Sequence, residues 1–142
     1  MEWKKNEDKG GRSVLLPLRK EVCCNENFRK AVWTGEYAQI TVMTIPPKGE
    51  IGLEIHENLD QIFYVENGIA SVYMGKMKQC VQYVGKASSG CAVVIAADTW
   101  HNIVNEHAVP LKMFSVYAPK KHPFGTVHRT KKDADEAELA RE

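Results

Sequence analysis

From residue 36 to residue 118 the chain is a succession of short β-rich segments, and this pattern limits the fold more than any other feature of the sequence. Turn residues interrupt the pattern about every eight to twelve positions, and no long stretch has the apolar period of a helix. Antiparallel sandwiches and barrels have this spacing. The pattern therefore predicts an all-β domain of about eight strands.

The predicted strands are separated by residues that favour turns. Asn67-Gly68, between the third and fourth strands, is the strongest two-residue signal for a β-hairpin. The eight predicted segments are 37–45, 51–56, 61–66, 69–74, 77–84, 91–96, 100–105 and 111–118.

The segments on either side of this region have a different composition. Residues 1–12 are polar and end in Gly10-Gly11, which predicts a flexible arm. Residues 13–36 have scattered apolar side chains without a period, so we expect an extended lead-in. Thr130 followed by Asp133 resembles a capping box and predicts a short helix over 131–141. The predicted organisation is an arm (1–12), one barrel domain with its lead-in (13–130) and a short helix or tail (131–142).

Overall charge and composition exclude several classes of protein. A chain of 142 residues with 44% hydrophobic and 26% charged residues is typical of one ordinary globular domain. Its formal net charge of +1 gives no strong attraction to nucleic acid or an acidic membrane, and no apolar run is long enough to span a bilayer. We expect no nucleic-acid or membrane partner. The N-terminus lacks the apolar segment of a secretory signal, which predicts a cytoplasmic protein.

Polar side chains on two of the predicted strands indicate a site. Alternation along residues 51–56 places Glu54 and His56 on one face, with the three aliphatic residues on the other. His101 lies on another strand. A lone strand histidine is more often structural or exposed to solvent, but a carboxylate buried in a barrel needs a partner. One metal ion would satisfy Glu54, His56 and His101 together.

The ligand types limit which metal this site would hold. Two neutral imidazoles and a carboxylate are associated with open-sided non-haem iron sites, and manganese, nickel or zinc also accept them. Gln61 would supply a fourth, neutral oxygen. The sequence therefore predicts a divalent ion (Fe, Mn, Zn or Ni) held by Glu54, His56, Gln61 and His101. It does not identify catalytic residues beyond these ligands.

The spacing of these residues resembles the paired motifs of the cupin family. Glu54 stands where the family usually has its first histidine, and Gln61 stands where it usually has glutamate. A carboxylate has in effect moved from one ligand position to the other, which favours a retained metal. The matching positions are Glu54-Ile55-His56, Gln61 and Gly68 in the first motif, and Gly90, Ala96-Ala97-Asp98, His101 and Asn105 in the second.

This resemblance covers about residues 28–132 and implies a double-stranded antiparallel β-helix, or jelly-roll barrel, that forms a homodimer. Several segments are similar to small single-domain bacterial cupins, some of them likened to phosphomannose isomerase. The implied function is a metal-binding cupin that binds or acts on a small polar, sugar-like molecule. A metal-dependent isomerase and a dioxygenase are the enzyme classes that this implies. The alternatives are a non-catalytic module that binds a small ligand and a protein–protein adaptor without metal.

Two further histidines and five apolar or aromatic residues are predicted to lie around the site. His122 and His128 flank Pro123-Phe124-Gly125, and we expect them to form hydrogen bonds in a loop or to line the mouth of the cavity rather than bind metal. Strand parity predicts an apolar cavity wall made of Met43, Phe63, Val65, Ile103 and Tyr117.

Overall fold

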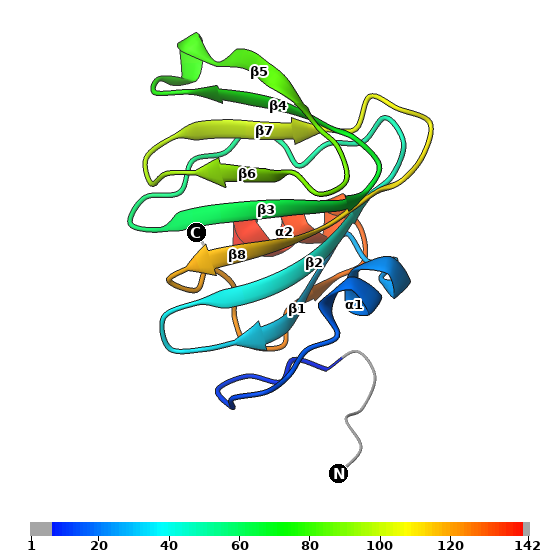
Figure 1. Ribbon diagram of the computed structural model, residues 1–142. Helices are drawn as coiled ribbons and strands as arrows, with labels where there is room; N and C mark the ends of the chain where they lie inside the picture. The colour runs from blue at the N-terminus through cyan, green and yellow to red at the C-terminus, as the bar shows by residue number, and fades with distance from the viewer. Residues whose placement is uncertain (1–6, 141–142) are drawn as a thin grey trace.

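A computed structural model describes residues 7–140 and shows two antiparallel sheets that share one core, with their strands labelled in Figure 1. The strands are β1 Arg29–Thr34, β2 Gln39–Ile45, β3 Asp60–Asn67, β4 Ala70–Gly75, β5 Gln82–Ala87, β6 Ala92–Ile95, β7 Trp100–Val104, β8 Leu111–Ala118 and β9 Val127–His128. The helices are α1 Leu18–Cys24, the short 3₁₀ helix η1 Lys78–Cys80 and α2 Lys131–Ala140. The larger sheet has the order β6-β3-β8-β2-β1-β9 and the smaller one β5-β4-β7. The predicted all-β jelly roll with a short C-terminal helix is confirmed.

The structure corrects the sequence prediction in three segments. Residues 13–36 contain α1 and β1 instead of an extended lead-in. Residues 51–56 form one isolated bridge, between Glu54 and His101, instead of a regular strand, because Gly52 has a φ of 103°. Residues 77–84 divide into η1 and the first part of β5. The β1 strand has no alternating pattern because five of its six residues are buried, so both of its faces are covered.

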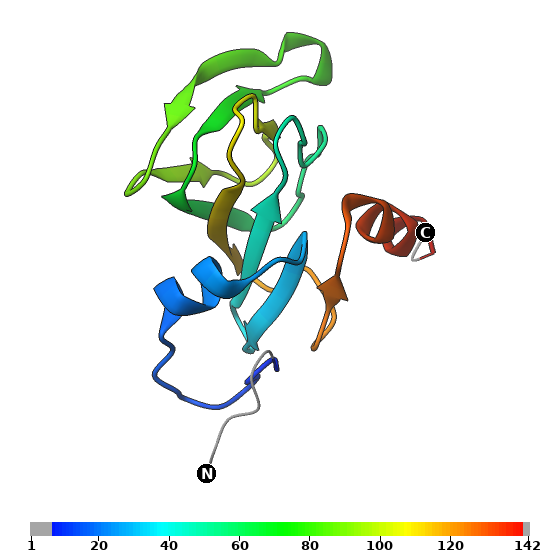
Figure 2. The same ribbon diagram turned by 90° about the vertical axis from the view of Figure 1, so that its right-hand side faces the viewer.

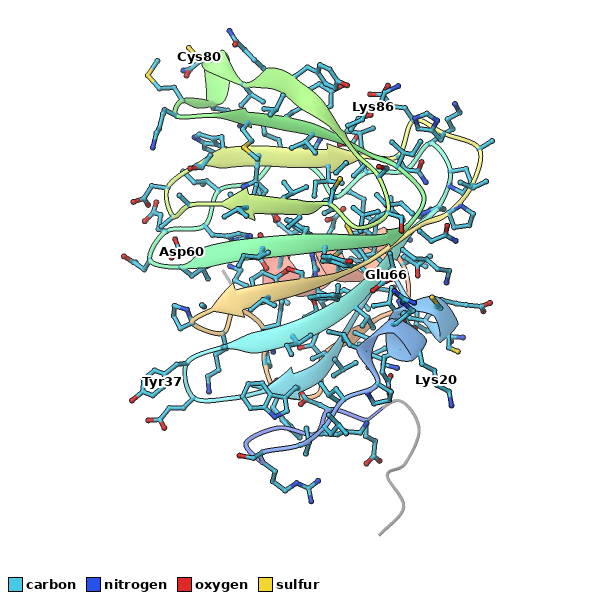
Figure 3. The ribbon with its side chains drawn as sticks, in the orientation of Figure 1. Lys20, Tyr37, Asp60, Glu66, Cys80 and Lys86 are labelled. Atoms are coloured by element: carbon cyan, nitrogen blue, oxygen red, sulfur yellow. The ribbon has the colours of Figure 1, made fainter. Side chains whose placement is uncertain are left out.

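The core lies between the two sheets, and a second apolar cluster lies outside them. Phe63, Ile103 and Met113 are fully buried in the core, and Val22 of α1 packs on the outer face of the larger sheet. In Figure 2, α1 and α2 lie on opposite sides of that sheet. Glu66, labelled beside α1 in Figure 3, forms an ion pair with Arg19 of that helix at 3.3 Å. The residues predicted to wall an apolar cavity are all buried: Met43, Phe63, Val65, Ile103 and Tyr117.

Both ends of the described chain are attached to the larger sheet. Residues 1–6 of the predicted arm lie outside the described residues, but Lys9 and Gly11 donate backbone hydrogen bonds to β1. The backbone N–H of Asp133 donates to Thr130 Oγ1 at 3.1 Å, which confirms the predicted helix cap. Ala134 of α2 is buried in the core. No helix within residues 7–140 has the length and apolar character needed to cross a membrane.

Replacement of Gly68 by alanine should destabilise the fold by about 2–3 kcal/mol. Gly68 has a φ of 88°, and an added Cβ would lie 2.7 Å from the carbonyl oxygen of Pro110. Gly90 is a matched control, because its φ is 90° but an added Cβ would meet no atom within 4 Å. Urea denaturation should show a larger loss for Gly68→Ala than for Gly90→Ala. Equal losses would show that the predicted backbone clash has no cost.

Candidate metal centre

The segment formed by residues 51–56 lies beside β7 and carries two of the predicted ligands. The backbone N–H of Glu54 donates to the carbonyl of His101 at 3.0 Å, and the N–H of His101 donates back at 2.9 Å. Residues paired in this way point their side chains to the same face of a sheet. The predicted aliphatic face is only partly formed, since Ile51 is buried but Leu53 is 40% exposed. The irregular backbone at Gly52 accounts for this difference.

Three of the four predicted ligands converge. Glu54 Oε1 lies 3.2 Å from His56 Nε2 and 3.4 Å from His101 Nε2. One ligand atom from each side chain lies within 4.8 Å of those from the other two. His101 is fully buried, His56 is nearly so, and Glu54 is partly open to the pocket. These distances suit three ligands on one side of a single ion.

His101 is held in the tautomer that a metal ligand requires. Its Nδ1 lies 2.9 Å from the carbonyl oxygen of Thr99, and a carbonyl only accepts, so Nδ1 carries the hydrogen. In the neutral ring Nε2 then keeps its lone pair. This buried atom has no hydrogen-bond partner among the described residues, yet it faces Glu54 Oε1. A metal-bound histidine is usually oriented in this way by its second nitrogen.

The carboxyl group of Glu54 is held in its charged form. Burial raises its pKa, but the nearby His101 and His56 side chains, and after them the positive charge of Arg29, hold the pKa well below its usual range. An ionised carboxylate beside two imidazoles is a donor set that Fe(II), Mn(II), Ni(II) and Zn(II) accept. The three residues therefore fit a divalent ion by their chemistry as well as by their positions.

Gln61, the fourth predicted ligand, is buried in β3. Its Nε2 donates to Ser115 Oγ at 2.9 Å, while its Oε1 is buried without a hydrogen-bond partner. A free amide oxygen facing inward is compatible with the predicted fourth ligand. That role stays a prediction.

A pocket of about 280 Å³ is lined by two of the three ligands, Glu54 and His56. Its walls come from three parts of the chain: the segment from Ile51 to His56, the start of β1 with the loop before β9, and one face of α2. The lining residues outside 51–56 are Phe28, Arg29, Lys121, His122, Lys131, Ala134, Asp135 and Glu138. This volume is at the small end for binding pockets and suits a metabolite of few atoms.

The sequence does not predict the pocket positions of two residues in full. Arg29 lies in the stretch that was predicted to be an extended lead-in, where no pattern marks it as buried. His122 was expected in a loop or at the cavity mouth, and it lies in the pocket wall. Its backbone N–H donates to Gln39 Oε1 at 2.9 Å, and its carbonyl accepts from Gln39 Nε2 at 2.9 Å. The buried Gln39 therefore anchors the loop.

Stability should fall in mild acid because of His122. Burial, and after it the positive charge of Arg29, lowers the pKa of His122 from 6.5 to about 2. The unfolded chain gains this proton near pH 6.5 and the folded chain does not. The contribution of the neutral His122 ring to the free energy of unfolding is therefore complete above pH 6.5. It falls by about 1.4 kcal/mol for each pH unit below that value.

Urea denaturation at pH 7.5 and pH 5.5 tests this contribution, because the pKa of Glu54 lies below this window both in the unfolded chain, at 4.5, and in the folded chain, where it is lowered. Between pH 7.5 and pH 5.5 the free energy of unfolding should fall in both proteins. We expect the fall to be about 1.4 kcal/mol smaller in His122→Gln than in the original chain. The same pH dependence in both proteins would contradict the assignment. Metal-free protein should be used, so that proton competition for metal does not contribute.

Comparison with known proteins assigns a family to this geometry. Residues 41–117 match a family model described as a cupin domain, and this match covers more than half of the chain. The chain is 42% identical over 132 residues to the uncharacterized protein YrkC of Bacillus subtilis, covering 93% of this chain and 71% of that protein. It is 33% identical over 114 residues to the uncharacterized protein L612 of Acanthamoeba polyphaga mimivirus, covering 80% of this chain and 69% of that protein.

A solved structure agrees closely with the fold. The crystal structure of BH2720 from Bacillus halodurans superposes with a TM-score of 0.90 at 42% sequence identity. The superposition covers 92% of this chain and 98% of the other. The likeness therefore extends beyond the barrel strands to nearly the whole chain.

Proposed function

The chain belongs to the cupin domain family, and we propose on this basis that it binds one divalent metal ion and a small polar molecule beside it. The observation that carries the proposal is the buried Nε2 of His101, whose lone pair faces the ionised Glu54 at 3.4 Å. When the His101 ring is neutral, its Nε2 lone pair and the carboxylate repel each other unless a cation lies between them. A shared cation converts the repulsion into two favourable bonds.

The proposed ligands are Glu54, His56 and His101, with Gln61 as the fourth. When bound, the ion supplies Lewis-acid polarisation of an oxygen atom on the bound molecule. The protein holds His101 in orientation through Thr99 and keeps Glu54 ionised. The pocket on the open side of the ligands would hold the small molecule.

Metal titration of protein purified without an affinity tag tests this function. After removal of metal with a chelator and dialysis, Fe(II), Mn(II), Ni(II) and Zn(II) are added separately, and heat release and thermal midpoint are recorded. We expect one equivalent to bind and to stabilise the fold by about 2.7 kcal/mol at a free concentration of 100 times Kd. A folded protein that binds none of these ions in a one-to-one ratio would contradict the proposal.

The reaction class stays a prediction. A metal-dependent isomerase and a dioxygenase would both convert a bound molecule, whereas a binding module would release it unchanged. Incubation of the metal-loaded protein with a stabilising ligand, followed by mass spectrometry of the ligand, separates catalysis from binding.

A cytoplasmic location and a homodimer also stay predictions from the sequence. Ile62 of β3 and Val94 of β6 face each other in register and are 40% and 63% exposed. Burial of such an apolar pair against a second copy is favourable. Multi-angle light scattering should give twice the monomer mass of 16.0 kDa.

A further inference from the structure

Arg29 is a buried cation at the edge of the proposed metal site. It is the first residue of β1, only 7% exposed, and it lines the same pocket as Glu54 and His56. Its Nε is buried without a hydrogen-bond partner, and its Nη1 lies 3.4 Å from His128 Nδ1.

The two lysines that line the pocket have carboxylates beside them. Lys121 pairs with Glu138 at 3.7 Å, and Lys131 pairs with Asp135 at 2.8 Å. Glu54 contacts the two ligand histidines. Among the described lysines and arginines that line the pocket, Arg29 is the one without a carboxylate at ion-pair distance.

The polar neighbours of Arg29 do not supply a negative charge. Burial lowers the pKa of His122 to about 2, so its ring is neutral. Burial likewise raises the pKa of Tyr117, so its phenol is neutral. A buried guanidinium without an anion costs several kcal/mol of stability, and in proteins such a charge is usually paired.

We propose that Arg29 binds the carboxylate group of a small anionic molecule in this pocket, beside the metal ion. A guanidinium presents parallel N–H groups whose spacing matches the two oxygens of a carboxylate. One unpaired positive charge favours a singly charged group over a phosphate, which carries up to two. The position of the metal beside the carboxylate rests on the proposed function, but carboxylate binding by Arg29 does not.

The test compares two variants that remove one positive charge from the same pocket. Arg29→Met removes the unpaired guanidinium, and Lys131→Met removes a lysine that already pairs with Asp135. Acetate, malonate and succinate are titrated into metal-free and metal-loaded protein, with succinamide as the uncharged counterpart. We expect at least one of the carboxylates to bind to the original chain. Arg29→Met should lower the affinity for that carboxylate by about tenfold or more. Lys131→Met should change the affinity by less than about threefold, because its lysine is partly exposed and paired.

The stability of the variant without ligand separates binding from a structural role. Removal of an uncompensated buried charge should leave the urea midpoint of Arg29→Met unchanged or raised. A marked loss of stability would overturn the proposal, since Arg29 would then serve the fold. Binding of none of the three carboxylates, tighter binding of inorganic phosphate, or equal weakening by both variants would also overturn it.

The metal titration distinguishes this inference from the proposed function. Carboxylate binding that Arg29→Met abolishes in metal-free protein supports the role of Arg29 even if no ion binds. Stoichiometric metal binding with carboxylate affinity unchanged in Arg29→Met supports the metal site and contradicts the role of Arg29.

Discussion

His101→Ala should weaken binding of a divalent metal ion by more than about 100-fold, measured by isothermal titration of metal-free protein. His101 contributes one of three converging ligand atoms, and it comes from a different part of the chain than the other two. Its loss leaves Glu54 and His56, which are too few ligands to hold an ion tightly against water. The backbone hydrogen bonds between residues 54 and 101 do not depend on the imidazole, so the fold should remain.

His107→Ala is the matched control for this variant. His107 follows β7 in the chain, and it is not part of the cluster that converges around Glu54. It should bind metal as tightly as the original chain. Metal affinity retained in His101→Ala, with its fold verified by circular dichroism, would show that the ion is held elsewhere.

Phe63→Ala should destabilise the metal-free protein by about 3–5 kcal/mol. Phe63 is fully buried in the core between the sheets, and its ring centroid lies 6.5 Å from that of His101. Truncation leaves a cavity that neighbouring strands cannot close, because both sheets are held in register by backbone hydrogen bonds. Urea denaturation followed by circular dichroism measures the loss.

Phe124→Ala serves as the comparison for the core variant. Phe124 is 66% exposed, so we expect its truncation to cost less than about 1 kcal/mol. Phe63→Ala should also weaken metal binding, because the cavity removes support from one side of the His101 ring. Similar small losses in both variants would contradict the placement of the core between the sheets.

The fold was largely predictable because most strands have one face in the core and turn residues at their ends. The segments around Gln61, Trp100 and Leu111 were located within about two residues. The β1 strand was missed because five of its six residues are buried, with Val32 packed in one cluster with Val22 of α1, which removes the alternation. Gly52 was read as part of a strand, although its positive φ interrupts the segment.

The candidate site was predictable only in part. Glu54 and His56 are two residues apart, so any extended backbone directs them to the same side, and motif spacing linked them to His101. Arg29 could not be found in this way. In the sequence, the hairpin of β1 and β2 separates Arg29 from Glu54. An arginine at the start of a β-rich stretch also normally lies in solvent. The position of Arg29 in the pocket arises from tertiary packing, which the local sequence pattern does not encode.

The most direct test of the metal site is a crystal structure of the metal-loaded protein with an anomalous difference map recorded at the absorption edge of the bound ion. We expect one strong peak at about 2.0–2.3 Å from Glu54, His56 and Nε2 of His101. A peak elsewhere, or none at all with a proton shared between Glu54 and His101, would contradict the account.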